Sequence, residues 1–260
     1  MKRHRNFQAL VFTLVIVMST GAVQAQGGET PAQAATRAES LNNRGIETAE
    51  AGNIAEAAKL FREAIRLRPD YAVAYGNLGK AFYYAQQLPE AIAALKKAIE
   101  LKPNYTEVYN NLGAIYIESG RNNEAAVVLE HAVELQPNFA AAHYNLGAVY
   151  IRQEKFKQAV QSLERAVRFE PDDAAMHADL GYSLWRLKKY NDAITQMLEA
   201  VRLQPQNPEA RLFLGQLYLL NRDKQSALAQ YQKLVAFNRQ SAQKLYDAIY
   251  ANMLVSAAKK

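Results

Sequence analysis

The chain has 260 residues, of which 50% are hydrophobic and 22% are charged, and its formal net charge is +6. It contains no cysteine, which excludes disulfides, thiolate metal sites and a cysteine nucleophile. Three of its 31 basic residues lie among the first five positions. The remaining 28 nearly balance 25 acidic residues, so charge gives no reason to expect a nucleic-acid partner.

The N-terminus has the three-part layout of a secretory signal peptide. A cationic start, Met1–Arg5, precedes the apolar run Phe7–Met18, and a segment of small and polar residues ends at Ala25. The apolar run is shorter than the roughly 20 residues that a membrane-spanning helix needs. We therefore expect cleavage after Ala25, export to the periplasm or the medium, and no integral membrane segment in the mature chain. The alternative is that the segment is kept as a membrane anchor.

From residue 38 onward, one pattern recurs every 34 residues. Its central copy contains the residues Tyr109, Leu112, Gly113, Tyr116, Ala125, Leu129, Ala132 and Pro137. The same or similar residues occur 34 positions away on both sides, and eight matched positions in three successive registers identify a repeat protein. Extending the register predicts six repeats, a flexible linker before them and a capping helix after them. The expected ranges are 26–37 for the linker, 38–71, 72–105, 106–139, 140–173, 174–207 and 208–239 for the repeats, and 240–260 for the capping helix.

Each repeat is predicted to contain two helices. The apolar residues of its first half are spaced i, i+3, i+4 and i+7, which places them on one helical face. A turn is expected near Ser119-Gly120 in the central repeat. In the second half, small residues at Ala125 and Ala132 allow the two helix backbones to approach closely. Pro137 then ends the second helix, because proline cannot continue it and restricts the preceding residue. The fold class is therefore all-α.

This pattern resembles the tetratricopeptide repeat. The resemblance rests on Tyr or His, Leu-Gly and a second aromatic residue in the first helix, and on Ala, a large apolar residue, Ala and Pro in the second. It covers residues 38–239. It implies a right-handed α-solenoid superhelix whose first helices line a concave groove. It also implies a non-enzymatic scaffold that binds a protein or an extended peptide, but it does not identify the partner.

We find no pattern that indicates catalysis or a cofactor. The sequence lacks a P-loop, a dinucleotide-binding fingerprint and a calcium loop. His143 and His177 occupy equivalent positions in adjacent repeats, which are offset by roughly 8–10 Å. That offset prevents both from binding one metal ion at bonds of roughly 2 Å, so we expect them to have a structural role. The expectation is a protein without enzyme activity, cofactor or metal.

The residue before each Leu-Gly pair points away from the apolar face of the first helix. It is Asn43, Asn77, Asn111 and Asn145 in the first four repeats. An amide can both donate to and accept from a peptide group, so an asparagine ladder could hold the backbone of an extended ligand, as in the similar superhelix of the O-GlcNAc transferase family. Asparagine is also common here among tetratricopeptide repeats, so a local structural role is the alternative. The same face is expected to present Lys80, Tyr83, Tyr84, Asn110, Glu118, Tyr144, Arg152, Tyr182, Trp185 and Arg186, many of them types that dominate interface energy.

Two functions from different classes follow from these expectations. The first is an exported scaffold that binds a peptide segment or partner protein in its groove. The second is an envelope assembly factor for pili, secretion or cell-wall machinery. Six-repeat periplasmic pilus proteins resemble this architecture, but they are lipidated, and this chain has no cysteine to carry a lipid.

Overall fold

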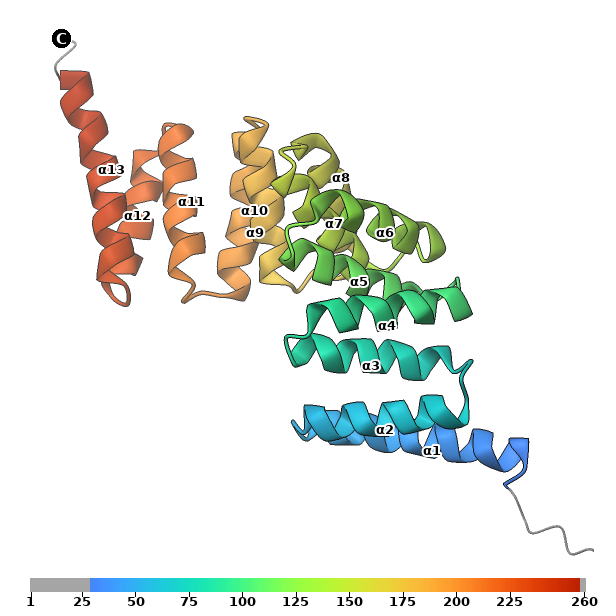
Figure 1. Cartoon of the computed structure of the whole chain (residues 1–260). Helices are drawn as coiled ribbons and strands as arrows, with labels where there is room; N and C mark the ends of the chain where they lie inside the picture. Colours follow the sequence, from blue (N-terminus) through green and yellow to red (C-terminus); the bar gives the residue numbers. More distant parts are fainter. Residues whose placement is uncertain (1–28, 258–260) are drawn as a thin grey trace, which may run out of the picture.

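The computed structural model describes residues 29–257, which form thirteen α-helices and no strand. The expected all-α solenoid is confirmed: antiparallel helix pairs stack side by side, and the stack turns so that α1–α4 lie crosswise to α9–α13 (Figure 1). The helices are α1 (Pro31–Glu50), α2 (Ile54–Leu67), α3 (Ala72–Tyr84), α4 (Leu88–Leu101), α5 (Thr106–Glu118), α6 (Asn122–Leu135), α7 (Ala140–Arg152), α8 (Phe156–Phe169), α9 (Ala174–Arg186), α10 (Tyr190–Leu203), α11 (Pro208–Leu220), α12 (Lys224–Val235) and α13 (Arg239–Ala257).

The first helices of neighbouring repeats converge on one side of the stack. Each helix packs against the next one in the chain, and from α1 to α9 each odd-numbered helix also touches the next odd-numbered one. The odd-numbered helices therefore line the inner, concave surface. The even-numbered helices of the repeats form the outer layer.

The turn inside each helix pair needs one residue with positive φ. In the central repeat this is Gly120, with φ of 71°. The next residue, Arg121, donates its backbone N–H to the Tyr116 carbonyl at 2.8 Å, which is the bond of a Schellman helix end. Only two of the six turns use glycine for a conformation that L side chains disfavour. The residues with positive φ are Gly52, Gln86, Gly120, Glu154, Lys188 and Arg222, each 34 positions from the next.

The expected proline stops end the second helices. Gln136, the residue before Pro137, has φ of −137° and ψ of 89°, so it has left the helical region as a pre-proline residue must. The core lies between the two helices of each pair. There Leu129 is fully buried, and a Cβ on Gly113 would lie only 2.5 Å from its Cγ. Glycine is therefore required for α5 to approach α6 this closely.

In four of the repeats, a polar side chain of the inner helix contacts the carbonyl of the proline before it. Nε2 of His143 lies 2.9 Å from the Pro137 carbonyl oxygen, and the ring is buried with 2% of its surface exposed. This contact explains why the same position tolerates several residue types that share a polar tip. The equivalent pairs are Tyr109 with Pro103, His177 with Pro171 and Arg211 with Pro205.

The buried ring of His143 is expected to make stability depend on pH. Burial lowers the pKa of His143; the hydrogen bond to Pro137 opposes part of this effect, and the positive charge of Arg165 adds a smaller decrease. The folded state therefore binds the proton less readily than the unfolded state, whose pKa is near 6.5. Stability from His143 is present above pH 6.5 and is lost as pH falls below it. We expect His143→Tyr, which copies Tyr109, to reduce the loss of stability between pH 7 and pH 5, measured by urea unfolding. An unchanged loss would contradict this role.

The expected flexible linker at 26–37 is wrong from Pro31 onward, because these residues form the first turns of α1. Thr30 accepts a hydrogen bond from the Gln33 backbone at 3.2 Å, and the Gln33 side chain accepts one from the Thr30 backbone at 2.9 Å. This capping box starts the helix, and Pro31 is at the first helical position, where proline is favoured. Pro31 therefore marks the start of a helix and does not belong to a linker.

At the other end of the array, α13 packs on both α11 and α12. Leu245 and Ile249 are 0% and 1% exposed in this contact. The expected signal peptide at 1–25 lies outside the described residues. Among the helices of residues 29–257, none combines the length and hydropathy required to cross a membrane.

Candidate functional site

Two of the four ladder asparagines bond to the neighbouring repeat. Asn77 Nδ2 donates to Asn42 Oδ1 at 2.9 Å, and Asn145 Nδ2 donates to Asn110 Oδ1 at 2.8 Å. Each donor lies 35 residues after its acceptor, one more than the repeat length. These amides therefore join adjacent inner helices, so the four ladder asparagines are not equivalent, and their binding of a ligand stays a prediction.

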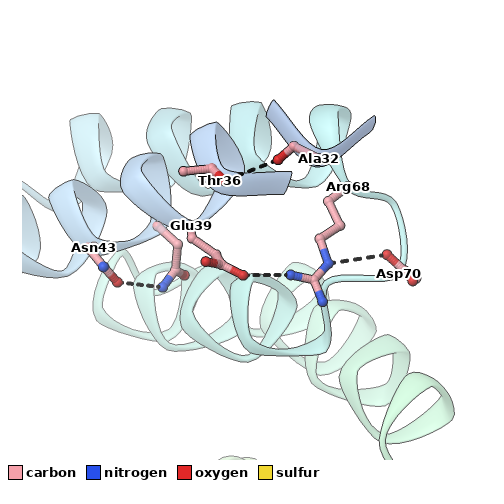
Figure 2. Close-up of polar contacts among 7 residues, drawn as sticks. Ala32, Thr36, Glu39, Asn43, Arg68 and Asp70 are labelled. Carbon is pink, nitrogen blue, oxygen red and sulfur yellow. Dashed lines mark hydrogen bonds and ion pairs between the residues drawn. The ribbon is translucent and has the colours of Figure 1, made fainter. Parts of the chain in front are cut away.

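Asn111 differs from its neighbours because its diagonal partner position is Gly76, which has no side chain. Within residues 29–257 the Asn111 side chain makes no hydrogen bond, although it is half-buried on α5 between the two bonded pairs. Asn43 is exposed on α1 and only accepts a long bond of 3.5 Å from Asn42 (Figure 2). The middle of the inner surface thus carries an amide with unused donors and acceptor.

Other types of side chain also pair between adjacent repeats at positions 35 residues apart. The Tyr144 hydroxyl bonds to Asp179, and burial together with that carboxylate raises the pKa of Tyr144 to about 12. Burial also raises the pKa of Asp179, against the opposite effect of the tyrosine bond. A hydrogen bond to Glu118, followed by burial, raises the pKa of Tyr83. Both tyrosines are therefore protonated hydrogen-bond donors at neutral pH.

Arg152 extends this arrangement with a contact to the backbone. Its Nη1 donates to the carbonyl oxygen of Ile117 at 2.9 Å, again 35 residues earlier. The predicted groove residues Tyr83, Glu118, Tyr144 and Arg152 thus lie on the inner surface, and each already has a partner there.

An aromatic cluster covers the inner surface of repeats five and six. The Trp185 ring lies 5.5 Å from Tyr182 and, edge to face, 5.5 Å from Phe213. The guanidinium of Arg186 lies 4.0 Å from the centre of the Phe156 ring and donates to the Tyr182 hydroxyl at 3.0 Å. Cation–π and edge-to-face contacts fix these side chains in place. The cluster is a preformed apolar surface.

Lys80 and Tyr84 are the predicted residues that are freest to meet a partner. Tyr84 has 62% of its surface exposed, and Lys80 is exposed without an ion pair in the described part of the chain. At the N-terminal end, Arg68 joins α1 to the loop after α2 through Glu39 at 3.0 Å and Asp70 at 3.5 Å (Figure 2).

Sequence reasoning missed two features of the inner surface. Asn42, which is 2% exposed, is the acceptor for Asn77, and it was not among the predicted site residues. A cavity of about 440 Å³ opens between α1 and α3 and includes Ala49, Phe61 and Lys80 in its lining. No cluster of three His, Cys, Asp or Glu residues in 29–257 is arranged to hold a metal ion.

Two family models match the sequence. The model described as the cilia and flagella-associated protein 70 C-terminal domain matches residues 45–210, and a tetratricopeptide repeat model matches residues 178–244. The first covers more than half of the chain. A comparison with curated proteins gave no match.

Several solved structures share the fold. PilF of Pseudomonas aeruginosa has a TM-score of 0.73 and 21% identity, over 83% of this chain and 99% of that chain. YrrB, described as a tetratricopeptide-repeat protein with an unusual peptide-binding site, has a TM-score of 0.66 and 23% identity, over 73% of this chain and 99% of that chain. MamA of Desulfovibrio magneticus has a TM-score of 0.60 and 25% identity, over 65% and 96%. The first two likenesses show the fold alone.

Proposed function

We propose, from the premise that this chain belongs to the tetratricopeptide-repeat family, that its concave surface holds an extended peptide segment of a partner protein. The fold is a scaffold suited to protein–protein interaction, and this family and fold typically have no enzymatic activity. Binding of a peptide in the groove is the additional step that we propose here.

Asn111 is the observation that carries the proposal. It is a half-buried amide in the middle of the concave surface, flanked by two equivalent amides that are bonded within the protein. A half-buried amide gains by pairing, and a peptide group can satisfy its donors and its acceptor together. Exposed Lys80 and Tyr84 lie on the neighbouring helix α3, where they can contact the same segment.

We also propose export, on the basis of the three-part N-terminal segment in the sequence. Proteinase protection in intact and in osmotically opened cells tests it, because an exported chain is digested only after the outer barrier is opened. An envelope assembly role is the alternative to general peptide binding. Loss of pili, secretion or cell-wall growth in a deletion strain would favour that alternative.

Asn111 and Asn145 are expected to respond oppositely to truncation. Asn111→Ala breaks no internal bond, so the free energy of unfolding should stay within about 0.5 kcal/mol of wild type while partner recovery falls. Asn145→Ala leaves Asn110 without its donor and should lower the free energy of unfolding by about 1–2 kcal/mol. Urea unfolding and quantitative crosslinking to envelope proteins measure the two effects. Equal partner recovery by wild type and Asn111→Ala would remove this amide from the binding site.

A further inference from the structure

Repeat one has a small side chain at a position where every other repeat has a large one. The position is the twelfth of the repeat, near the end of the inner helix. In repeats two to six its residue packs on the hydrophobic core, and in repeat one it is Ala49. The five large residues are Tyr83, Ile117, Ile151, Trp185 and Leu219.

The cavity between α1 and α3 lies at this place. Its volume is about 440 Å³, within the range of small ligand pockets. Phe61 forms the floor because the ring lies against Gly45, where a Cβ would be only 2.6 Å from the ring. Ile46, Ile54 and Ala81 add apolar walls. The pocket therefore has the shape and polarity that a large apolar side chain fills in the other repeats.

The rim of this pocket is polar and carries both signs of charge. Glu50 on α1 and Lys80 on α3 line it, and neither has an ion pair within residues 29–257. Asn77 donates to Asn42 but its own Oδ1 accepts no bond from the described residues. An extended segment that follows the groove passes α1 and then α3. Its charged residues would meet Glu50 and Lys80 in turn, and a backbone N–H could bond to Asn77.

We infer that this pocket, here called the Ala49 pocket, is the anchor site for a partner peptide. The peptide places one large aromatic or aliphatic side chain in the pocket, with a basic residue on the α1 side and an acidic residue on the α3 side. The inference rests on the proposed function and names the part of the peptide that the groove recognises. Apolar burial provides the affinity, and the two rim charges select the direction of the chain.

The test is selection of displayed random dodecapeptides on the full 260-residue chain. We expect the selected peptides to share a large apolar residue flanked by opposite charges. They should bind Ala49→Tyr, which copies Tyr83, about 10- to 100-fold more weakly, since the added ring fills the pocket. Ala49→Ile, which copies Ile117, should act in the same direction. Lys80→Glu should weaken binding of the peptides, because it places a negative charge beside their acidic residue.

Ala93→Tyr is the matched control because it adds the same ring at an exposed position on α4, away from the pocket. It should bind the peptides as wild type does. Both Ala49 variants should unfold at or above the wild-type temperature, because they fill a cavity, so lost binding would not reflect misfolding. Selected peptides that bind Ala49→Tyr as tightly as wild type would overturn the Ala49 pocket as anchor while leaving groove binding intact. A selection that enriches no peptide would count against both proposals.

Two further experiments test for other occupants of the Ala49 pocket. Competition between a synthetic peptide of residues 1–28 and the selected peptides, for a chain that lacks those residues, would assign the pocket to this chain's own N-terminal segment. Self-association that Ala49→Tyr abolishes, measured by analytical ultracentrifugation, would assign it to a second copy. Either result would overturn a partner peptide as the occupant.

Discussion

Leu129→Ala is expected to lower the free energy of unfolding by about 3–5 kcal/mol. The side chain is fully buried in the centre of the array, and α5 lies directly on it because Gly113 has no side chain. Removing the leucine leaves a cavity that the stacked helices on both sides hold open. Gly113→Ala alone should cost about 1–3 kcal/mol, since its Cβ would lie 2.5 Å from Leu129 Cγ.

The double variant Gly113→Ala/Leu129→Ala provides the sharper test. The new methyl group enters the space that the leucine has left, so the pair should cost at least about 1 kcal/mol less than the sum of the single variants. Urea unfolding followed by circular dichroism measures all three. Leu198→Ala is the control, because this leucine is 43% exposed and should cost less than about 1 kcal/mol. Strict additivity would contradict the close packing of α5 on Leu129.

Replacing both Leu245 and Ile249 with alanine is expected to destabilise the C-terminal end by roughly 4–8 kcal/mol. In repeats one to five, the glycine of the inner helix packs on a residue 16 positions later, as Gly113 does on Leu129. In repeat six, Gly215 packs on Leu245 of α13 instead, 30 positions later. The capping helix therefore supplies a core residue of the last repeat as well as covering its open face.

Hydrogen exchange can locate this loss along the array. Because repeats contact only their neighbours, protection should fall in α11 and α12 and persist in α3–α8. Lys244→Ala, at an exposed position on the same helix, should leave the exchange pattern unchanged. An equal loss of protection in every helix would show instead that the whole array unfolds as one unit.

The expected helix pairs were predictable from the sequence because the residues that form them act locally. The inner helices α3, α5, α7, α9 and α11 begin at the first residues of expected repeats two to six. Proline stops, small residues and apolar spacing each act within one repeat, so a 34-residue register contains all the necessary information. The start of α1 was missed because Thr30 and Pro31 are also common in loops.

Which groove residues form hydrogen bonds within the protein was not predictable from the repeat pattern. Asn77, Asn111 and Asn145 are identical in type and in repeat position, yet only Asn111 lacks a partner within residues 29–257. The difference comes from Asn42, Gly76 and Asn110, one position earlier in the preceding repeat. A comparison of equivalent positions cannot show this diagonal contact, because it depends on the rotation between neighbouring inner helices.

The repeat, its period, the helix pairs and the solenoid can be predicted from the amino-acid sequence, because they depend on spacing within about 34 residues. Which inner side chains remain available to a partner, and where the surface is hollow, depends on contacts between repeats. Ala49 was visible in the sequence as a small residue in a series of large ones. The pocket beside this small residue is formed together with Phe61 and with α3, which packing between repeats brings close to α1.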